Sequence, residues 1–130
     1  MGTRLGLAEL KSARLTRADF SSASLDHADV RWATGVQVRF TDASMRWADL
    51  RSATLAAATF EGADLREADL SGGAFPFASF KGADLRGANF DGADVSGANF
   101  DRARLSSQTK LSKATGLAAE VVAACKQIGC

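Results

Sequence analysis

The sequence has very few of the residues that carry most enzyme chemistry. In 130 residues it contains one histidine, two cysteines, one proline and no tyrosine. With His27 as the single histidine, no set of nucleophile, base and orienting residue can be assembled. No Gly-rich segment is followed by the Lys-Ser or Lys-Thr of a phosphate-binding loop. We therefore expect a protein that is not an enzyme and that uses no cofactor and no metal.

A strong charge of one sign and long apolar runs are also missing. Sixteen basic and 15 acidic residues give a formal net charge of +1. Neither direct nucleic acid binding nor attraction to an anionic membrane is expected from this balance. The sequence has no stretch of 18 apolar residues and no segment that resembles a signal peptide. We expect a cytoplasmic location and no membrane association.

The two cysteines, Cys125 and Cys130, both lie in the segment CKQIGC at the C-terminus. Their spacing matches no zinc or thioredoxin-type motif, and two ligands do not close a tetrahedral metal site. We expect both to be incidental, Cys125 as a small apolar helix residue and Cys130 as part of a frayed end. A disulfide between two chains is the alternative.

What the sequence does contain is a five-residue repeat. A large apolar residue, here called the centre of a pentad, stands at every fifth position from Leu5 to Leu105, with Gly35 as the one exception among 21. Two residues before the centre stands Ala in 18 of 21 cases. The exceptions are Thr3, Val38 and Gly73. This pattern indicates a narrow coil in which one small and one large side chain of each pentad point inward.

The length of one turn follows from the aromatic centres. A helix is excluded, because a step of five residues advances about 140° and would spread the apolar positions around the whole circumference. Phe recurs every 20 residues, at Phe20, Phe40, Phe60, Phe80 and Phe100. Rings repeating at this interval are best explained by stacking on one wall. The sequence therefore predicts an all-β, four-sided solenoid with four pentapeptides per coil and about five coils.

The repeat is expected to stop after Leu105, which divides one domain into a β-helix at 1–107 and a C-terminal turn and capping α-helix at 108–130. The helix is predicted at about 117–128, ending at Gly129. Its apolar face is formed by Leu117, Val121, Val122, Cys125 and Ile128. The N-terminal end lacks a comparable cap, so its first coil frays, or another chain stacks on it, or the chain is a piece of a longer protein.

Outward positions 20 residues apart form columns, and one wall of the solenoid is poor in charge. It includes a candidate partner surface formed by Trp32, Val36, Ala56, Pro76 and Phe77. Both irregular pentads, GVQVRF and SGGAFPF, fall on this wall. The alternative is that local bulges turn Val36 or Phe77 inward.

Two further columns carry charge. Trp47 with Arg46, Arg66 and Arg86 forms a candidate corner for an anion or an acidic partner. The alternative is a set of arginines neutralised by Glu67, Asp64 and Asp84, and His27 next to Trp47 is expected to be solvated. Asp29, Asp49 and Asp69 form an acidic ladder, which we expect to be scaffold, neutralised by Arg31 and Arg51, instead of a Ca²⁺ site.

The segments GADLRGANF and EGADLREADL, with the unbroken phase of residues 3–107, resemble the pentapeptide-repeat family. The resemblance implies a right-handed, four-sided β-helix. The function expected first is a non-catalytic, protein-binding scaffold that presents a rigid rod to a protein partner or to itself as a homodimer. The resemblance also implies an alternative, a DNA-mimic modulator or protector of type II topoisomerases (DNA gyrase) that confers antibiotic or toxin resistance, although this chain is short and electrically balanced. A structural module of a larger protein is the third hypothesis.

Overall fold

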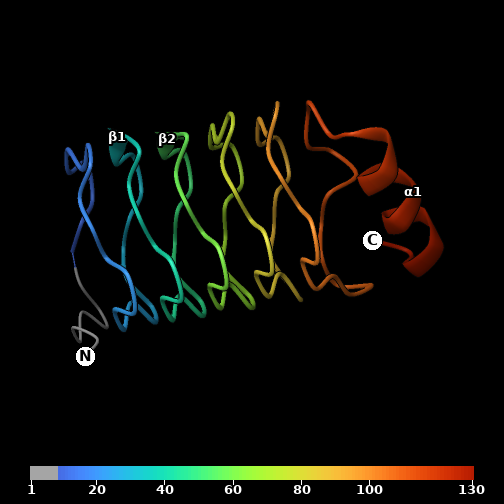
Figure 1. The fold of residues 1–130 in the computed structure, drawn as a ribbon, viewed down its shortest axis with the longest axis horizontal. Helices are drawn as coiled ribbons and strands as arrows, with labels where there is room; N and C mark the ends of the chain where they lie inside the picture. Colours follow the sequence, from blue (N-terminus) through green and yellow to red (C-terminus); the bar gives the residue numbers. More distant parts are fainter. Residues whose placement is uncertain (1–8) are drawn as a thin grey trace.

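In a computed structural model, the chain forms an elongated solenoid whose turns are stacked along one axis (Figure 1). The structure describes residues 9–130, so the predicted start of the repeat at residue 3 lies outside the described residues. Parallel backbone bridges join residues that are 20 apart, as in Arg14↔Thr34 and Asp19↔Arg39. Such bridges recur at every fifth residue, so four ladders run along the solenoid.

Within residues 9–130, regular strand structure occurs in one of the four ladders. β1 (Thr34–Val36) and β2 (Thr54–Ala56) pair in parallel, with Gly35 opposite Leu55. They lie in adjacent turns on the same side of the solenoid (Figure 1). Elsewhere each pentad contributes a single bridge and then bends, and the bend is closed by a hydrogen bond such as that from Ala23 N–H to the Phe20 carbonyl, at 3.0 Å. The short pentad leaves no room for longer strands.

The interior is filled by the two inward residues of each pentad. From Ala23 to Val95 nearly all of these side chains are buried. The aromatic column stacks face to face, with ring centroids 5.0–5.4 Å apart along Phe20, Phe40, Phe60, Phe80 and Phe100. Each aromatic pair of this kind contributes roughly 0.5–1.5 kcal/mol beyond its burial. The column therefore stabilises the stacking of turn upon turn.

We expected the repeat to stop after Leu105. In the structure it continues with a shift of one residue. Bridges Asn89↔Lys110 and Asp94↔Thr115 join residues that are 21 apart, so the parallel ladder extends past the predicted boundary at 107. The extra residue lies in the turn that leads to Thr109. A single insertion moves every later position out of the five-residue phase, which is why the continuation is hidden in the sequence.

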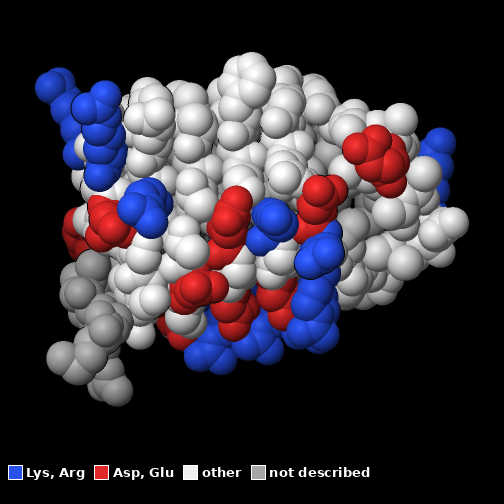
Figure 2. Space-filling model, in the orientation of Figure 1, with Lys and Arg blue, Asp and Glu red and all other residues white. Residues whose placement is uncertain are grey.

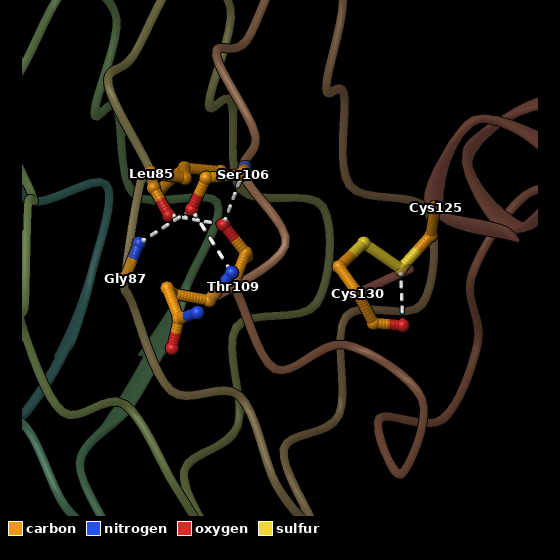
Figure 3. Close-up of a disulfide and its surroundings, with 7 residues drawn as sticks. Leu85, Gly87, Ser106, Thr109, Cys125 and Cys130 are labelled. Atoms are coloured by element: carbon orange, nitrogen blue, oxygen red, sulfur yellow. Dashed lines mark hydrogen bonds between the residues drawn. A yellow bond between two sulfur atoms is a disulfide. The ribbon is translucent and has the colours of Figure 1, made fainter. Parts of the chain in front are cut away.

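Thr109 takes the inward place that Ala occupies in most pentads. It is 1% exposed, and its hydroxyl donates a hydrogen bond to the Leu85 carbonyl at 2.7 Å (Figure 3). The same hydroxyl oxygen accepts from the Ser106 N–H at 3.0 Å. A buried hydroxyl that is satisfied in both roles fixes the shifted turn against the turn before it.

The helix α1 (Ala119–Ile128) covers part of the C-terminal end (Figure 1). It begins two residues later than expected and ends, as predicted, at Gly129, whose φ of 81° is left-handed. Val121 and Cys125 are buried, whereas Ile128 is 42% exposed and does not share the buried face. No helix within residues 9–130 has the length and apolar character needed to span a bilayer.

Cys125 and Cys130 are joined by a disulfide (Figure 3). The expectation that both are incidental is wrong, and so is the alternative of a bond between two chains. The reason is the left-handed turn at Gly129, which folds the chain back so that the Cys130 N–H donates to the Cys125 carbonyl at 3.0 Å. This places the two Cα atoms 5.0 Å apart, within the range that a disulfide bridges.

Candidate binding surfaces

The side of the solenoid that carries β1 and β2 has few charged side chains on its outside, where the exposed Thr34 and Thr54 lie among apolar residues. We call the group Trp32, Val36, Ala56, Pro76 and Phe77 the apolar wall. Trp32 is 49% exposed, Val36 48% and Phe77 72%, and these are three of the five exposed large apolar side chains in residues 9–130. Ala56 and Pro76 are half-buried between them. The upper edge of the molecule in Figure 2 has no charged side chain over most of its length.

The two irregular pentads are explained by packing inside the core. Gly35 stands where a large centre is expected, and a Cβ there would lie 2.9 Å from Cγ2 of the buried Val38, which fills the space. At Gly73 a Cβ would lie 2.6 Å from Cε2 of Phe75, so the ring occupies the place of the usual Ala. Each missing side chain is thus compensated by a larger one in the same turn.

Because the core is filled in this way, the outward residues next to these pentads do not turn inward. The hypothesis that a bulge buries Val36 or Phe77 is wrong, since both side chains are exposed to solvent. Phe77 and Trp32 also have left-handed backbones, with φ of 59° and 57°. This conformation costs a bulky residue of order 1–3 kcal/mol, so neither aromatic residue is favoured by the backbone or required by the core.

Neighbouring residues contact both aromatic residues on the outside. The ammonium of Lys11 lies 5.2 Å from the centre of the Trp32 ring, and the guanidinium of Arg31 lies 5.3 Å from it. Phe77 lies over Gly97 in the next turn, where a Cβ would approach the ring to 2.6 Å. The prediction from the sequence did not assign Lys11, Arg31 or Gly97 to this wall, although the 20-residue columns place all three beside these aromatic residues.

The arginine corner consists of Arg46, Arg66 and Arg86 beside Trp47. Each guanidinium is bound by a carboxylate: Arg46 by Asp26, Arg66 by Asp64 and Arg86 by Asp84, with closest N···O distances of 2.7, 2.7 and 2.6 Å. Hydrogen bonds from Arg66 lower the pKa of Asp64, and those from Arg86 lower the pKa of Asp84. An incoming anion would have to compete with these carboxylates.

Trp47 extends this corner with an aromatic stack. Its ring lies parallel to that of His27, with centroids 4.9 Å apart, and the Arg46 guanidinium lies 5.3 Å from its centre. A shallow cleft of about 340 Å³ opens between Trp47, Glu67 and the three arginines. His27 therefore packs on an aromatic ring. The assignment of the corner to an anion or an acidic partner stays a prediction.

The acidic ladder is paired with arginines along its length. Arg31 binds Asp29 at 2.8 Å and approaches Asp49 at 3.6 Å, while Arg51 binds Asp49 at 2.7 Å and approaches Asp69 at 4.0 Å. Hydrogen bonds from the Arg31 side chain lower the pKa of Asp29 to about 2. Among residues 9–130 no group of three or more His, Cys, Asp or Glu side chains is arranged to hold a metal ion.

A groove at the C-terminal end was not predicted. It has a volume of about 470 Å³ and lies between residues 98–105 and α1. The sequence contains one signal for it: Thr109 and Leu111 repeat the small-x-large spacing one residue late, which shows that the next turn is displaced. The groove itself depends on where α1 packs, which the five-residue pattern does not determine.

The fold and its surfaces define a parallel β-solenoid repeat protein with extended outer walls. A family model described as pentapeptide repeats matches it in eight copies, over residues 3–34, 36–72 and 77–106. The chain belongs to the pentapeptide-repeat family, as its resemblance predicted. The match is interrupted at Gly35 and at 73–76, which are the irregular pentads on the apolar wall.

Solved structures of similar proteins were also found. A pentapeptide repeat protein from the Arabidopsis thaliana thylakoid lumen is 22% identical, covers 88% of this chain and 74% of its own, and has a TM-score of 0.45. Rfr23 from the cyanobacterium Cyanothece 51142 is 19% identical over 82% of this chain and 86% of its own, with a TM-score of 0.41. QnrB1, a plasmid-mediated fluoroquinolone resistance protein, is 19% identical over 94% of this chain and 70% of its own, also at 0.41. No curated protein matches the chain in sequence. Likeness at this level adds nothing about function.

Proposed function

We propose that the protein is a non-catalytic scaffold, a rigid right-handed β-helical rod of about five coils, that binds a protein partner through its apolar wall. One observation carries the proposal: Trp32, Val36 and Phe77 expose large apolar surfaces on one side of the rod. Contiguous apolar surface with aromatic residues is typical of protein interfaces. The cytoplasmic location stays a prediction. The disulfide between Cys125 and Cys130 argues against it, because such bonds are rare in reducing compartments.

The shape of the wall supports a protein partner more than a small ligand. Trp32 and Phe77 project at two levels of the rod, and the small side chains of Ala56 and Ala57 lie between them. Aromatic residues separated by a turn with small outward side chains leave room for a ridge on a partner, and aromatic residues commonly contribute most of the binding energy. The partner is therefore expected to present apolar side chains to this wall.

The gyrase-modulator alternative gains no support from the charged columns. A DNA mimic needs unpaired negative charge along its length, whereas Arg31 and Arg51 alternate with the carboxylates of the acidic ladder. A supercoiling assay with purified gyrase separates the two functions. Inhibition or protection by this chain would favour the alternative.

The proposal is tested by removing the two aromatic side chains without disturbing the backbone. Trp32→Gly with Phe77→Gly places glycine at two left-handed positions, where glycine is the preferred residue. Ser22→Gly, at φ 59° on a corner that belongs to neither candidate surface, is the matched control. Tagged chains are isolated from their native cells, and the proteins that copurify are identified by mass spectrometry.

The expected result is a partner that is captured by the parent chain and by the Ser22→Gly control but lost from the double variant. Sedimentation of the purified chain identifies the case in which a second copy is the partner, because the double variant then converts a dimer to a monomer. Equal capture and equal mass for all three chains would contradict the proposal.

A further inference from the structure

The rung formed by residues 98–105 has an edge that is left without a backbone partner. In the preceding turn, Phe80 N–H donates to the Asn99 carbonyl at 2.7 Å, and Leu85 N–H donates to the Arg104 carbonyl at 2.8 Å. The same pattern would pair the rung 98–105 with a following turn. The backbone groups that point along the rod toward this missing turn are the N–H of Phe100, Arg102 and Leu105 and the carbonyls of Ala98 and Ala103. None of these five groups forms a hydrogen bond within residues 9–130.

The shifted last turn explains why this edge is open. Its bridges, at Lys110 and Thr115, extend only two of the four ladders. The ladders that end at Asn99 and Arg104 are not continued within the described residues, and the chain proceeds instead to α1. A ladder edge with free N–H and C=O groups is a template for another extended segment.

The open edge lies beside the groove of about 470 Å³. Phe100 and Leu105 of the rung line one side, and Val121 and Ala124 of α1 line the other. Phe100 and Leu105 are partly exposed here, although Phe80 and Leu85, one turn earlier, are completely buried. A strand edge that faces a helix across a groove lined by both apolar and polar residues is suited to hold a peptide in extended conformation.

We propose that this groove binds an extended segment of a partner protein, which adds one more parallel rung to the solenoid. Main-chain hydrogen bonds to the open edge supply affinity, and inward side chains supply specificity, as in other cases of strand addition. The columns fix the pattern of the bound segment. Ala78 and Phe80 lie one turn before Ala98 and Phe100 in the same columns. The bound segment is therefore expected to carry a small residue and, two positions later, a large apolar residue. The same pair recurs five residues further along the segment.

The charges at the rim add a second requirement. Asp101 and Glu120 both line the groove, and they favour a basic residue directly after the first large one. Arg104 is 62% exposed and makes only a distant pair with Asp84, at 3.7 Å, so it favours an acidic residue opposite it. The expected pattern is Ala-x-Phe-Lys-x-Ala-Asp-Leu. Residues 78–85, ASFKGADL, have this pattern and pair with the other edge of the same rung.

The test uses the full chain and a synthetic peptide, ASFKGADLR with blocked ends. The peptide is titrated into isotope-labelled protein while the backbone amide signals are followed by NMR. We expect saturable shifts of the Phe100, Arg102 and Leu105 amides. A control peptide of the same composition, ASFDGAKLR, exchanges the two charges and is expected to bind about threefold more weakly, since exposed ion pairs contribute little.

Two variants of α1 distinguish peptide binding in the groove from binding elsewhere on the helix. Ala124 lines the groove and is exposed, so Ala124→Arg fills the groove without burying a charge in the core. Ala123 is exposed on the same helix but does not line the groove, and Ala123→Arg is the matched control. We expect at least a tenfold loss of peptide affinity for the first variant and no change for the second.

Three results would overturn the proposal: no shifts at millimolar peptide, shifts that map to the apolar wall, or equal losses in both variants. Sedimentation of the protein alone provides the remaining check. A dimer that Ala124→Arg converts to a monomer would mean that a second copy occupies this end, which also overturns the proposal. The inference is independent of the apolar wall, because Trp32 and Phe77 do not line the groove.

Discussion

The ring of Phe77 lies over the backbone of Gly97, one turn further along the rod. A Cβ at position 97 would come within 2.6 Å of Cδ1 of the ring, so only glycine leaves room for it. The ring is nevertheless 72% exposed. A large aromatic side chain therefore lies on the outer surface against a residue that has no side chain of its own.

Phe77→Gly is expected to leave the free energy of unfolding within about 1 kcal/mol of the parent. The lost contact with Gly97 is offset because glycine relieves a left-handed backbone, which costs a larger residue of order 1–3 kcal/mol. Chemical denaturation measures the difference. A loss above about 2 kcal/mol would mean that the ring belongs to the core, contrary to our assignment.

Gly73→Ala is expected to destabilise the fold by about 1–3 kcal/mol, the usual cost of overpacking. The new Cβ would lie 2.6 Å from the Phe75 ring. With Phe75→Leu added, the turn acquires the Ala and Leu of the regular repeat, as at Ala53 and Leu55, and the clash with the aromatic ring is removed. The double variant should be more stable than the sum of the two single changes predicts. Strict additivity in a double-mutant cycle would contradict the packing explanation.

Thr109→Val is expected to cost about 1–3 kcal/mol of stability, because it removes a buried hydroxyl that donates to the Leu85 carbonyl and accepts from Ser106. The valine has nearly the same shape, so the loss reports mainly on hydrogen bonding. Thr109→Ser keeps the hydroxyl and should cost less. If the two variants are equally unstable in thermal denaturation, the hydroxyl does not fix the shifted turn.

The Asp29–Arg31 pair predicts acid sensitivity. Hydrogen bonds from Arg31 lower the pKa of Asp29 to about 2 in the folded protein, below the value of about 3.9 for an unfolded chain. The pair therefore adds stability above about pH 4, and this contribution is lost as the pH falls toward 2. Asn stands in the same column at Asn89 and keeps the local turn. In the Asp29→Asn variant, the free energy of unfolding should fall less steeply between about pH 4 and about pH 2 than in the parent. If variant and parent show the same dependence of this free energy on pH, the pair contributes nothing.

The regular part of the fold could be predicted from the sequence because its determinants are local and periodic. The position of each inward residue depends only on its place in the pentad, so the stacked Phe20 and Phe40 rings follow directly from their spacing. The same reasoning placed Trp32, Val36 and Phe77 at outward positions but left open whether Val36 or Phe77 turns inward, and all three are exposed. Family membership follows from the same pattern.

The departures from the repeat could not be predicted, because they depend on contacts that do not follow from the 20-residue spacing of the sequence. The space beside Gly35 is filled by Val38, which is visible only once the backbone path is known. The continuation through Thr109 is hidden by one inserted residue. The disulfide of Cys130 depends on the direction in which the chain turns at Gly129.

Site-specific crosslinking in the native cell tests the central claim most directly. A photoreactive phenylalanine analogue replaces Ala57, at the floor of the apolar wall, and in a control chain it replaces Gly82, at a different corner. The account predicts a discrete crosslinked product from position 57 that is absent from position 82 and that disappears when Trp32→Gly and Phe77→Gly are added. Equal products from both positions, or a product that persists without the two aromatic side chains, would contradict it.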